Sequence, residues 1–380
     1  MNRNIKKCSL CLAVFALALY GCKSQKEAVA TAPVKNSVGI TTSYMDKSTN
    51  PADDFNRYVN GTWLDKTEIP ADRTRWGSFD ELRKNTDDDV MTILKDAIND
   101  KTIDPNSDQA KAISLYKTVL DTETRNKQGI EPLKPYLAKI NAVQNADQLV
   151  ALLAEMEPEM GLGFFGSYIG ADAKNSNKNV IYVGTGSLGL PDRDYYVSDA
   201  PDNKEKREKY LAHVSRMLQF IGENEATANA NAKKILALET KMSTATLDRV
   251  QRRDRRNTYN PMAFADLQKL TPTVKWESYF QTVGIGKVDS LVVSQPKYLQ
   301  AIETILKDNQ VEDWKAYMRW TALRGSSSLL ATEIENANFD FYGKTLTGAV
   351  KQRPAEERAL ATVNGRLGEA LGKLYVAKKF

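Results

Sequence analysis

The sequence has little of what a metal site or a disulfide needs. It contains one histidine, His213, and three cysteines, Cys8, Cys11 and Cys22. A catalytic zinc usually takes at least two nitrogen or sulfur ligands, and a Ser-His-Asp hydrolase needs a histidine beside its nucleophile. His213 has no second histidine four residues further on, and no G-x-S-x-G motif is present. We therefore expect a structural or surface histidine, no metal ligands and no catalytic residues in this chain.

A long hydrophobic run is also missing. The apolar stretch from Cys8 to Leu19 follows three basic residues and is shorter than the about 20 residues that span a bilayer. Gly21 followed by Cys22 resembles the bacterial lipobox, in which the cysteine is lipidated after cleavage. We predict a lipoprotein exported to the bacterial cell envelope and anchored in a membrane through Cys22. An ordinary secretory signal with an incidental cysteine is the alternative.

These features predict three parts of the chain. Residues 1–21 form the signal peptide. The polar residues 22–50 are a disordered tether, because they contain too little apolar surface to fold. Residues 51–380 form the folded domain. After cleavage Cys22 is the only cysteine left, so no intramolecular disulfide can form and the core must supply the stability.

Charge gives no reason to expect a nucleic-acid partner. The net charge of +5 falls to +2 once the three basic residues of the signal peptide are subtracted. One arginine cluster has no interleaved aromatic residues and is interrupted by Asp254. We interpret it as a salt-bridged helix end. Its members are Arg249, Arg252, Arg253, Arg255 and Arg256.

The pattern beyond Pro51 predicts a mainly α, multi-helix fold. A helix start is indicated at Ser78, where the serine can cap the helix and Glu81 can complete a capping box. Further helical stretches are expected at Ala110–Thr124, Ala146–Met156, Lys204–Ile221, Ala226–Leu247, Lys297–Leu306, Trp314–Ile334 and Ala355–Tyr375.

One interruption of the helical pattern predicts a small β-hairpin near residues 164–184. Phe164–Ile169 and Val180–Val183 are short β-prone runs on either side of a turn-rich segment. Leu291–Val293 is a candidate third strand. The glycines of residues 184–189 fit G-x-G-x-x-G, but a dinucleotide site needs a helix that begins inside that motif, and Leu190-Pro191 follow instead. We interpret this segment as a loop.

Four segments follow one another along the folded domain. They are Pro51–Phe55 with Tyr58–Leu64, then Arg73–Arg83, then Gly189–Tyr196, and finally Phe341–Leu346 with the stretch up to Val376. In this order they resemble the neprilysin and endothelin-converting-enzyme family of zinc metallopeptidases, which includes bacterial oligopeptidases. Ala52 stands where many animal members have a disulfide cysteine, which fits a bacterial member.

The resemblance implies hydrolysis of peptide bonds in oligopeptides by a zinc-bound water that a glutamate activates. Arg75 matches the family arginine that binds the free C-terminal carboxylate of a short substrate, and Arg83 matches its neighbour on the next helix. This helical half closes over the active site in the family. The H-E-x-x-H motif, its downstream carboxylate ligand and the N-A-[YF] motif of the other half do not occur here.

The leading hypothesis is therefore the N-terminal part of a lipid-anchored zinc oligopeptidase, cut short before its C-terminal catalytic domain and inactive alone. One alternative is a stand-alone peptide-binding or structural lipoprotein that has lost catalysis. Another is a half that folds alone and binds a separately encoded catalytic half.

Overall fold

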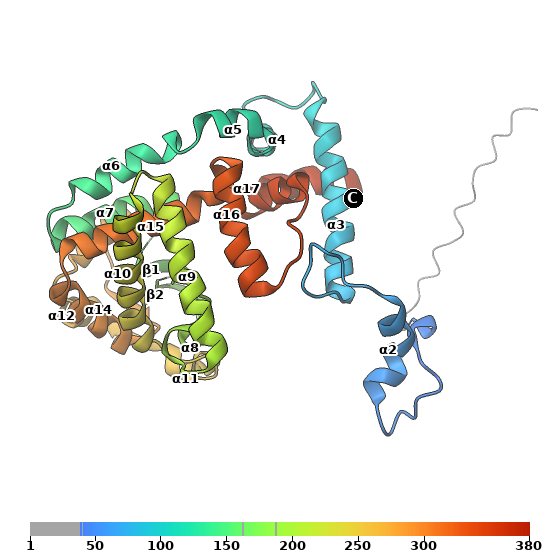
Figure 1. Cartoon of the computed structure of the whole chain (residues 1–380), viewed down its shortest axis with the longest axis horizontal. Coiled ribbons are helices and arrows are strands. Elements are labelled where there is room, and N and C mark those ends of the chain that lie inside the picture. Colours follow the sequence, from blue (N-terminus) through green and yellow to red (C-terminus); the bar gives the residue numbers. More distant parts are fainter. Residues whose placement is uncertain (1–38, 40, 162, 187) are drawn as a thin grey trace, which may run out of the picture. The chain divides into compact units, whose positions relative to one another are not determined.

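The computed structural model describes residues 39, 41–161, 163–186 and 188–380 (Figure 1). These residues fall into two compact units, one that ends at Glu68 and one that comprises Ile69–Phe380. The predicted signal peptide, Cys22 and most of the predicted tether lie outside the described residues. In the part of the chain that is described, none of the helices is both long and apolar enough to span a bilayer.

The first unit is built on α2 (Phe55–Lys66). Asp54 caps this helix, because its carboxylate accepts a hydrogen bond of 2.8 Å from a backbone N–H of the first turn. The short 3-10 helix η1 (Thr42–Tyr44) precedes it, and the Thr62 hydroxyl donates to the Met45 carbonyl at 2.8 Å. The last residues of the predicted tether thus fold against α2.

The second unit is mainly α-helical, as predicted. Its longer helices are α3 (Ser78–Ile98), α4 (Asp108–Leu120), α6 (Lys134–Ala142), α7 (Ala146–Met160), α9 (Pro201–Phe220), α10 (Glu225–Thr244), α14 (Pro296–Asp308), α15 (Val311–Ser326), α16 (Thr332–Phe339) and α17 (Ala355–Lys379). Its shorter helical segments are α5 (Thr122–Gln128), η2 (Glu131–Leu133), α8 (Arg193–Val197), η3 (Gln251–Arg253), α11 (Arg255–Thr258), α12 (Phe264–Leu270), α13 (Trp276–Thr282), η4 (Ser327–Leu329) and the π-helical η5 (Asp340–Thr345).

Two predicted helices are interrupted in the structure. The stretch Trp314–Ile334 is divided among α15, η4 and α16. The stretch Ala110–Thr124 breaks at Asp121, whose carboxylate accepts from the Thr124 backbone N–H at 3.0 Å and so caps α5. A side chain that can replace a helical hydrogen bond allows a second helix to begin there. Continuous apolar periodicity did not reveal either break.

The predicted capping box at the start of α3 is wrong. Ser78 is the first helical residue, Gly77 occupies the N-cap position, and no side chain caps the helix. The carboxylate of Asp80, in the first turn, lies instead 3.4 Å from the Nε of Arg75. An acidic side chain in the first turn complements the positive end of the helix dipole without a capping box.

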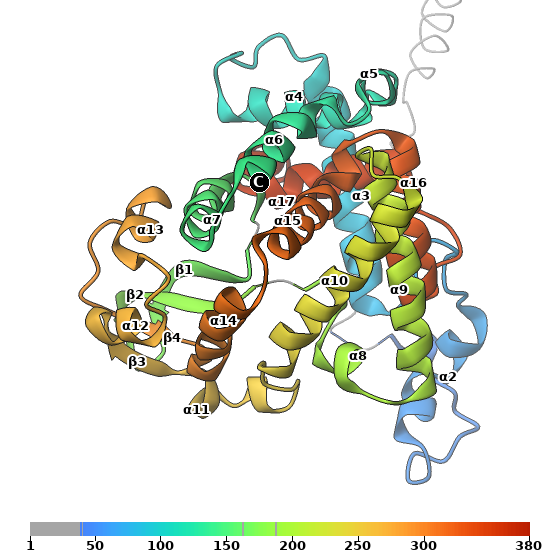
Figure 2. The same cartoon turned by 60° about the vertical axis from the view of Figure 1, so that its left-hand side comes forward.

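A four-stranded sheet contains the predicted hairpin (Figure 2). Strands β1 (Phe165–Asp172) and β2 (Asn175–Thr185) are antiparallel, and β4 (Ser290–Val293) pairs parallel to β2. Both the hairpin and the candidate third strand are confirmed. No sequence pattern predicted β3 (Asn260–Ala263), which lies antiparallel to β4 at the edge of the sheet. A strand of four residues with a proline has neither the length nor the alternation that a pattern needs.

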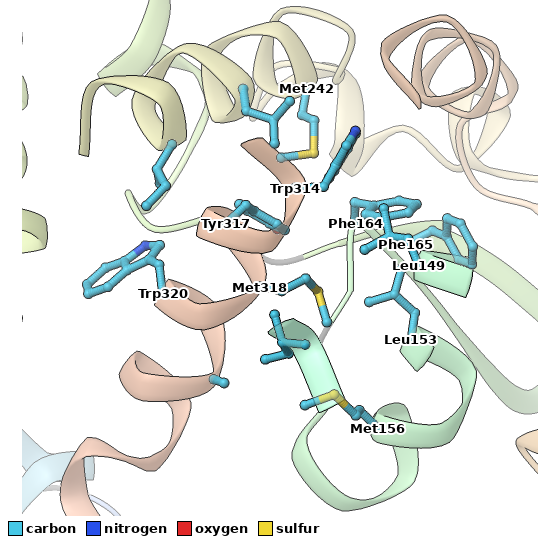
Figure 3. Packing of buried hydrophobic residues seen from close by; sticks show 14 of the residues in the cluster. Leu149, Leu153, Met156, Phe164, Phe165, Met242, Trp314, Tyr317, Met318 and Trp320 are labelled. Carbon is cyan, nitrogen blue, oxygen red and sulfur yellow. The ribbon is translucent and has the colours of Figure 1, made fainter. Parts of the chain in front are cut away.

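The main hydrophobic core surrounds α15, which packs against α6, α7, α9 and α10. Trp314, Tyr317, Met318 and Trp320 lie on this helix and are fully buried (Figure 3). The ring of Trp314 lies 4.7 Å from that of Phe164, which joins the helix to the start of the hairpin. Buried residues follow one another from Ala316 to Met318 and from Trp320 to Leu323, so this stretch of α15 is buried around its circumference, as in a helix at the centre of a domain. A second cluster joins α3, α4 and α17.

Candidate substrate-binding site

The two predicted substrate-binding arginines lie at the start of α3. Arg75 precedes the helix, its side chain is 84% exposed, and its one ion pair among the described residues is the 3.4 Å contact with Asp80. Arg83 lies one to two turns into the helix, is 65% exposed, and has its Nε 3.4 Å from the carboxylate of Asp87. Such loosely held guanidiniums keep most of their hydrogen-bonding capacity for a ligand.

Arg75 lines a pocket of about 490 Å³ in which basic groups outnumber acidic ones. Asp72 and Asp80 are the two carboxylates of the lining. Guanidinium groups bind carboxylates through paired, planar hydrogen bonds, so this pocket suits an anionic ligand group. Arg83 lies outside the lining, and the structure therefore does not bring the two predicted arginines into one pocket. The basic residues of the lining are Arg73, Arg75, Lys351, Arg353 and Arg358.

Long-range contacts hold this pocket together. Arg73 forms an ion pair of 2.7 Å with Glu357 of α17, and the Lys351 backbone N–H donates to the Ala71 carbonyl at 3.0 Å. These two contacts fasten the segment before α3 to the segment before α17. The sequence did not indicate Lys351 or Arg358 as site residues, because only this pairing brings them beside Arg75.

A buried ion network supports the same wall. Glu335 of α16 accepts from Arg358 at 2.8 Å and from Arg125 at 3.0 Å. Arg125, only 7% exposed, also donates to the backbone carbonyls of Ser328 and Leu330 at 2.9 and 2.7 Å. Buried charges are stable when they are paired and hydrogen-bonded in this way. Arg358 is thereby fixed in the pocket with its charge partly neutralised.

Gly184 and Thr185 end strand β2, and Gly186 and residues 188–189 lie in the predicted loop, because the next helix begins only at Arg193. A Cβ on Gly186 would lie 2.2 Å from the carbonyl oxygen of Gly163, and one on Gly189 would lie 1.7 Å from the hydroxyl of Tyr210. Both glycines are therefore required for close packing rather than for a phosphate.

Glu239 of α10 holds this loop from inside the core. It is fully buried and accepts hydrogen bonds from the Gly189 backbone N–H at 3.0 Å and from the hydroxyls of Tyr196 and Tyr210 at 3.0 and 2.8 Å. Burial raises the pKa of the carboxyl above its ordinary value, against the lowering effect of Arg324 and of these hydrogen bonds.

His213 is a structural residue. It is 6% exposed, and its ring stacks on Phe341 at a centroid distance of 4.8 Å and meets the ring edges of Trp320 and Tyr342. Burial, followed by the charge of Arg216, lowers the pKa of His213 to about 3. Across residues 39, 41–161, 163–186 and 188–380, no group of three or more His, Cys, Asp or Glu side chains is placed to hold a metal ion. The described residues therefore do not fit a zinc ion.

Four of the five arginines of the cluster lie in two short helical segments, η3 and α11, rather than at the end of one helix, and Arg249 precedes both segments. Arg249 lies 3.5 Å from Asp192 and 3.4 Å from Asp194, and Arg256 pairs with Asp254 at 2.7 Å. The predicted salt bridges are thus present for two of the five arginines.

The fold and the basic pocket define a mainly α domain suited to binding an anionic ligand group, with no metal-binding group of its own in the described residues. The sequence model of peptidase family M13, for the N-terminal part of that family, matches residues 51–380. The chain therefore belongs to the M13 zinc metallopeptidases, and the resemblance to neprilysin and endothelin-converting enzyme is confirmed.

Individual relatives agree with this assignment. The chain is 27% identical to endothelin-converting enzyme 1 of Bos taurus, over 97% of this chain and 50% of that protein. It is 33% identical to the zinc metalloprotease Zmp1 of Mycobacterium tuberculosis, solved with an inhibitor, with a TM-score of 0.84 over 90% of this chain and 52% of that one. PepO of Lactobacillus rhamnosis shares the fold, with a TM-score of 0.78 at 18% identity, over 87% of this chain and 52% of that one. The chain thus spans about half the length of these relatives.

Proposed function

We propose that this chain forms the N-terminal part of a zinc-dependent metalloendopeptidase that hydrolyses oligopeptides, and that it supplies the helical domain that closes over the active site. The zinc ligands and the general base would come from a catalytic part beyond the residues described. Membership of the M13 family supports the reaction class, and the match to about half of each relative supports the division of labour. The chain alone is proposed to be inactive.

The observation on which this proposal depends is the basic pocket around Arg75. Arg75 has one loose ion pair, whereas Arg73 and Arg358 in the same lining are held by close carboxylate partners. Arg75 and Arg353, which forms no ion pair among the described residues, are therefore the guanidiniums most available to a ligand, and the family resemblance favours Arg75. We propose that it binds the free C-terminal carboxylate of a short peptide. Arg83, outside this pocket, is proposed to assist as a second, weaker contact.

The test uses the complete enzyme and two matched substrates, one with a free C-terminal carboxylate and one with a C-terminal amide. We expect Arg75→Met to lower kcat/KM for the free acid. The loss should correspond to about 1 to 3 kcal/mol, as for a lost charged hydrogen bond. The amide should lose little. Arg83→Met should produce the same pattern with a smaller loss.

Arg255→Met is the control, because Arg255 is exposed and lies outside the pocket. It removes the same charge from the protein, so it should leave the ratio between the two substrates unchanged. An equal loss on the acid and the amide in Arg75→Met would contradict the proposed role of Arg75.

We further propose that the protein is exported and held at the bacterial cell envelope by a lipid on Cys22. The proposal rests on the sequence pattern before Cys22. A lipid anchor followed by a polar stretch would hold the peptidase near a membrane surface and leave its pocket open to peptides. The partners proposed are then oligopeptide substrates, the catalytic part and a membrane, but no nucleic acid.

A further inference from the structure

A second pocket, of about 580 Å³, lies beside the loop that follows β2. Its wall includes the loop 188–192, the start of α8, η3, and the side chains of Arg324 and Tyr342. The volume is within the range of pockets that bind small ligands. Tyr342 also lines the pocket of Arg75, so the two pockets are neighbours.

Positive charge dominates this second pocket. Arg193, Arg252 and Arg324 line it, and Asp192 is the one carboxylate of the lining. That carboxylate lies 3.5 Å from the Nε of Arg249, outside the lining. Within the described part of the chain, none of the three lining arginines forms an ion pair. The buried carboxylate of Glu239 acts as a counter-charge for Arg324, so Arg193 and Arg252 are the guanidiniums that attract an anion to this partly enclosed site.

Two buried polar atoms of the lining also lack a partner. The Nε of Arg193 and the Oδ1 of Asn338 are inaccessible to solvent and form no hydrogen bond to any described residue. Arg324, by contrast, is oriented by a 2.6 Å hydrogen bond to the Leu188 carbonyl. A ligand atom is about the size of a water oxygen and cannot reach these two atoms, so a ligand must contact the terminal amino groups of the arginines instead.

We infer that this pocket binds the side-chain carboxylate of an acidic residue in a peptide. The arginines of the lining suit a carboxylate, because a guanidinium binds it through paired, planar hydrogen bonds, and the neighbouring pocket of Arg75 would hold another part of the same peptide. The inference rests on the proposed function in so far as the ligand is a peptide. This pocket would add a preference for acidic side chains to the binding of the C-terminal carboxylate that is proposed for Arg75.

The experiment measures binding to the full chain by calorimetry. The probe is the acetylated and amidated pentapeptide Ala-Ala-Glu-Ala-Ala, and its glutamine counterpart is the reference. Both peptides lack a free C-terminal carboxylate and so bypass the role proposed for Arg75. The glutamate peptide should bind at least about tenfold more tightly, and inorganic phosphate should compete poorly with it.

Arg252→Gln and Arg193→Gln should each remove most of this preference. Arg253→Gln is the matched control, because Arg253 neighbours Arg252, is exposed and lies outside the lining. Arg252 is also exposed, so its replacement leaves folding intact even if that of Arg193 does not.

Several outcomes would overturn the inference. They are equal affinity for the two peptides, no saturation up to about 10 mM, an equal loss in Arg252→Gln and Arg253→Gln, or phosphate binding as tightly as the glutamate peptide. Loss of the C-terminal preference in Arg75→Met without any change in the glutamate preference would separate the two sites. If Arg75→Met keeps both preferences, the proposed role of Arg75 is rejected and this pocket is retained.

Discussion

Replacing His213 by phenylalanine should make the protein less sensitive to acid. The imidazole is buried among aromatic rings, and burial lowers its pKa from the ordinary 6.5 to about 3. Arg216 and Arg324 also disfavour the charged form, whereas Asp340 and Asn338 favour it. The folded protein therefore keeps His213 neutral at pH values where the unfolded chain takes up a proton.

The sign of the effect follows from this difference in proton binding. Above pH 6.5 the histidine is neutral in both states and contributes no pH dependence. As the pH falls from 6.5 towards 3, only the unfolded state binds the proton, so the free energy of unfolding decreases. At pH 5, about 1.5 units below 6.5, the loss is about 2 kcal/mol, because each unit is worth about 1.36 kcal/mol.

The assay is urea unfolding at pH 7 and pH 5, for the natural protein and for His213→Phe. Other ionisable groups titrate alike in both proteins, so the difference between the two pH dependences isolates the histidine. Between pH 7 and pH 5 the free energy of unfolding should fall by about 2 kcal/mol less in the variant than in the natural protein. Phe341→Leu is the control, since it disturbs the same stack without removing a titrating group. It should change the free energy of unfolding by the same amount at pH 7 and at pH 5.

A direct observation complements the unfolding data. The sequence contains a single histidine, so the imidazole resonance of an untagged sample needs no assignment. It should keep the chemical shift of a neutral ring at pH 5. An ordinary titration near pH 6.5, or the same pH dependence in both proteins, would refute the reasoning.

Two further predictions concern the loop and the anchor. Gly186→Ala should lower the free energy of unfolding by about 1 to 3 kcal/mol, because the new Cβ would lie 2.2 Å from a backbone oxygen, and urea unfolding measures it. In Gly184→Ala the new Cβ would lie 3.7 Å from its nearest neighbour, the hydroxyl of Ser294, so this variant should unfold like the natural protein. A decrease in the free energy of unfolding as large as that of Gly186→Ala would count against the packing argument. Cys22→Ser should abolish incorporation of labelled fatty acid in a bacterial host, whereas Cys8→Ser should retain it, and persistent labelling of Cys22→Ser would exclude that cysteine as the anchor.

Local patterns in the sequence predicted most of the fold. The hairpin follows from β-prone runs around a turn, and the long helices follow from apolar periodicity, which both act over a few residues. The break at Asp121 depends on which side chain captures a backbone N–H, and β3 depends on an edge position beside β4. Neither is encoded in a short window of sequence.

The site was less predictable than the fold. Arg75 was named through a family resemblance that spans the domain, and the structure places it in a basic pocket. Lys351 and Arg358 lie more than 270 residues further along the chain and reach that pocket only through tertiary contacts. Arg193 and Arg324 belong to different helices in the same way. The glycine-rich segment before Arg193 fits a nucleotide motif, and the sequence already predicted a loop there because Leu190-Pro191 follow it.

The attachment of the loop to Glu239 has a consequence for any ligand of the second pocket. The Gly189 backbone N–H donates to the fully buried carboxylate of Glu239 on α10, and the Gly189 carbonyl accepts from the Tyr342 hydroxyl at 2.8 Å. At Gly189 the wall of the second pocket is therefore connected to the core, so opening at this residue would require breaking buried hydrogen bonds. A ligand that binds this wall should stabilise the folded protein against global unfolding.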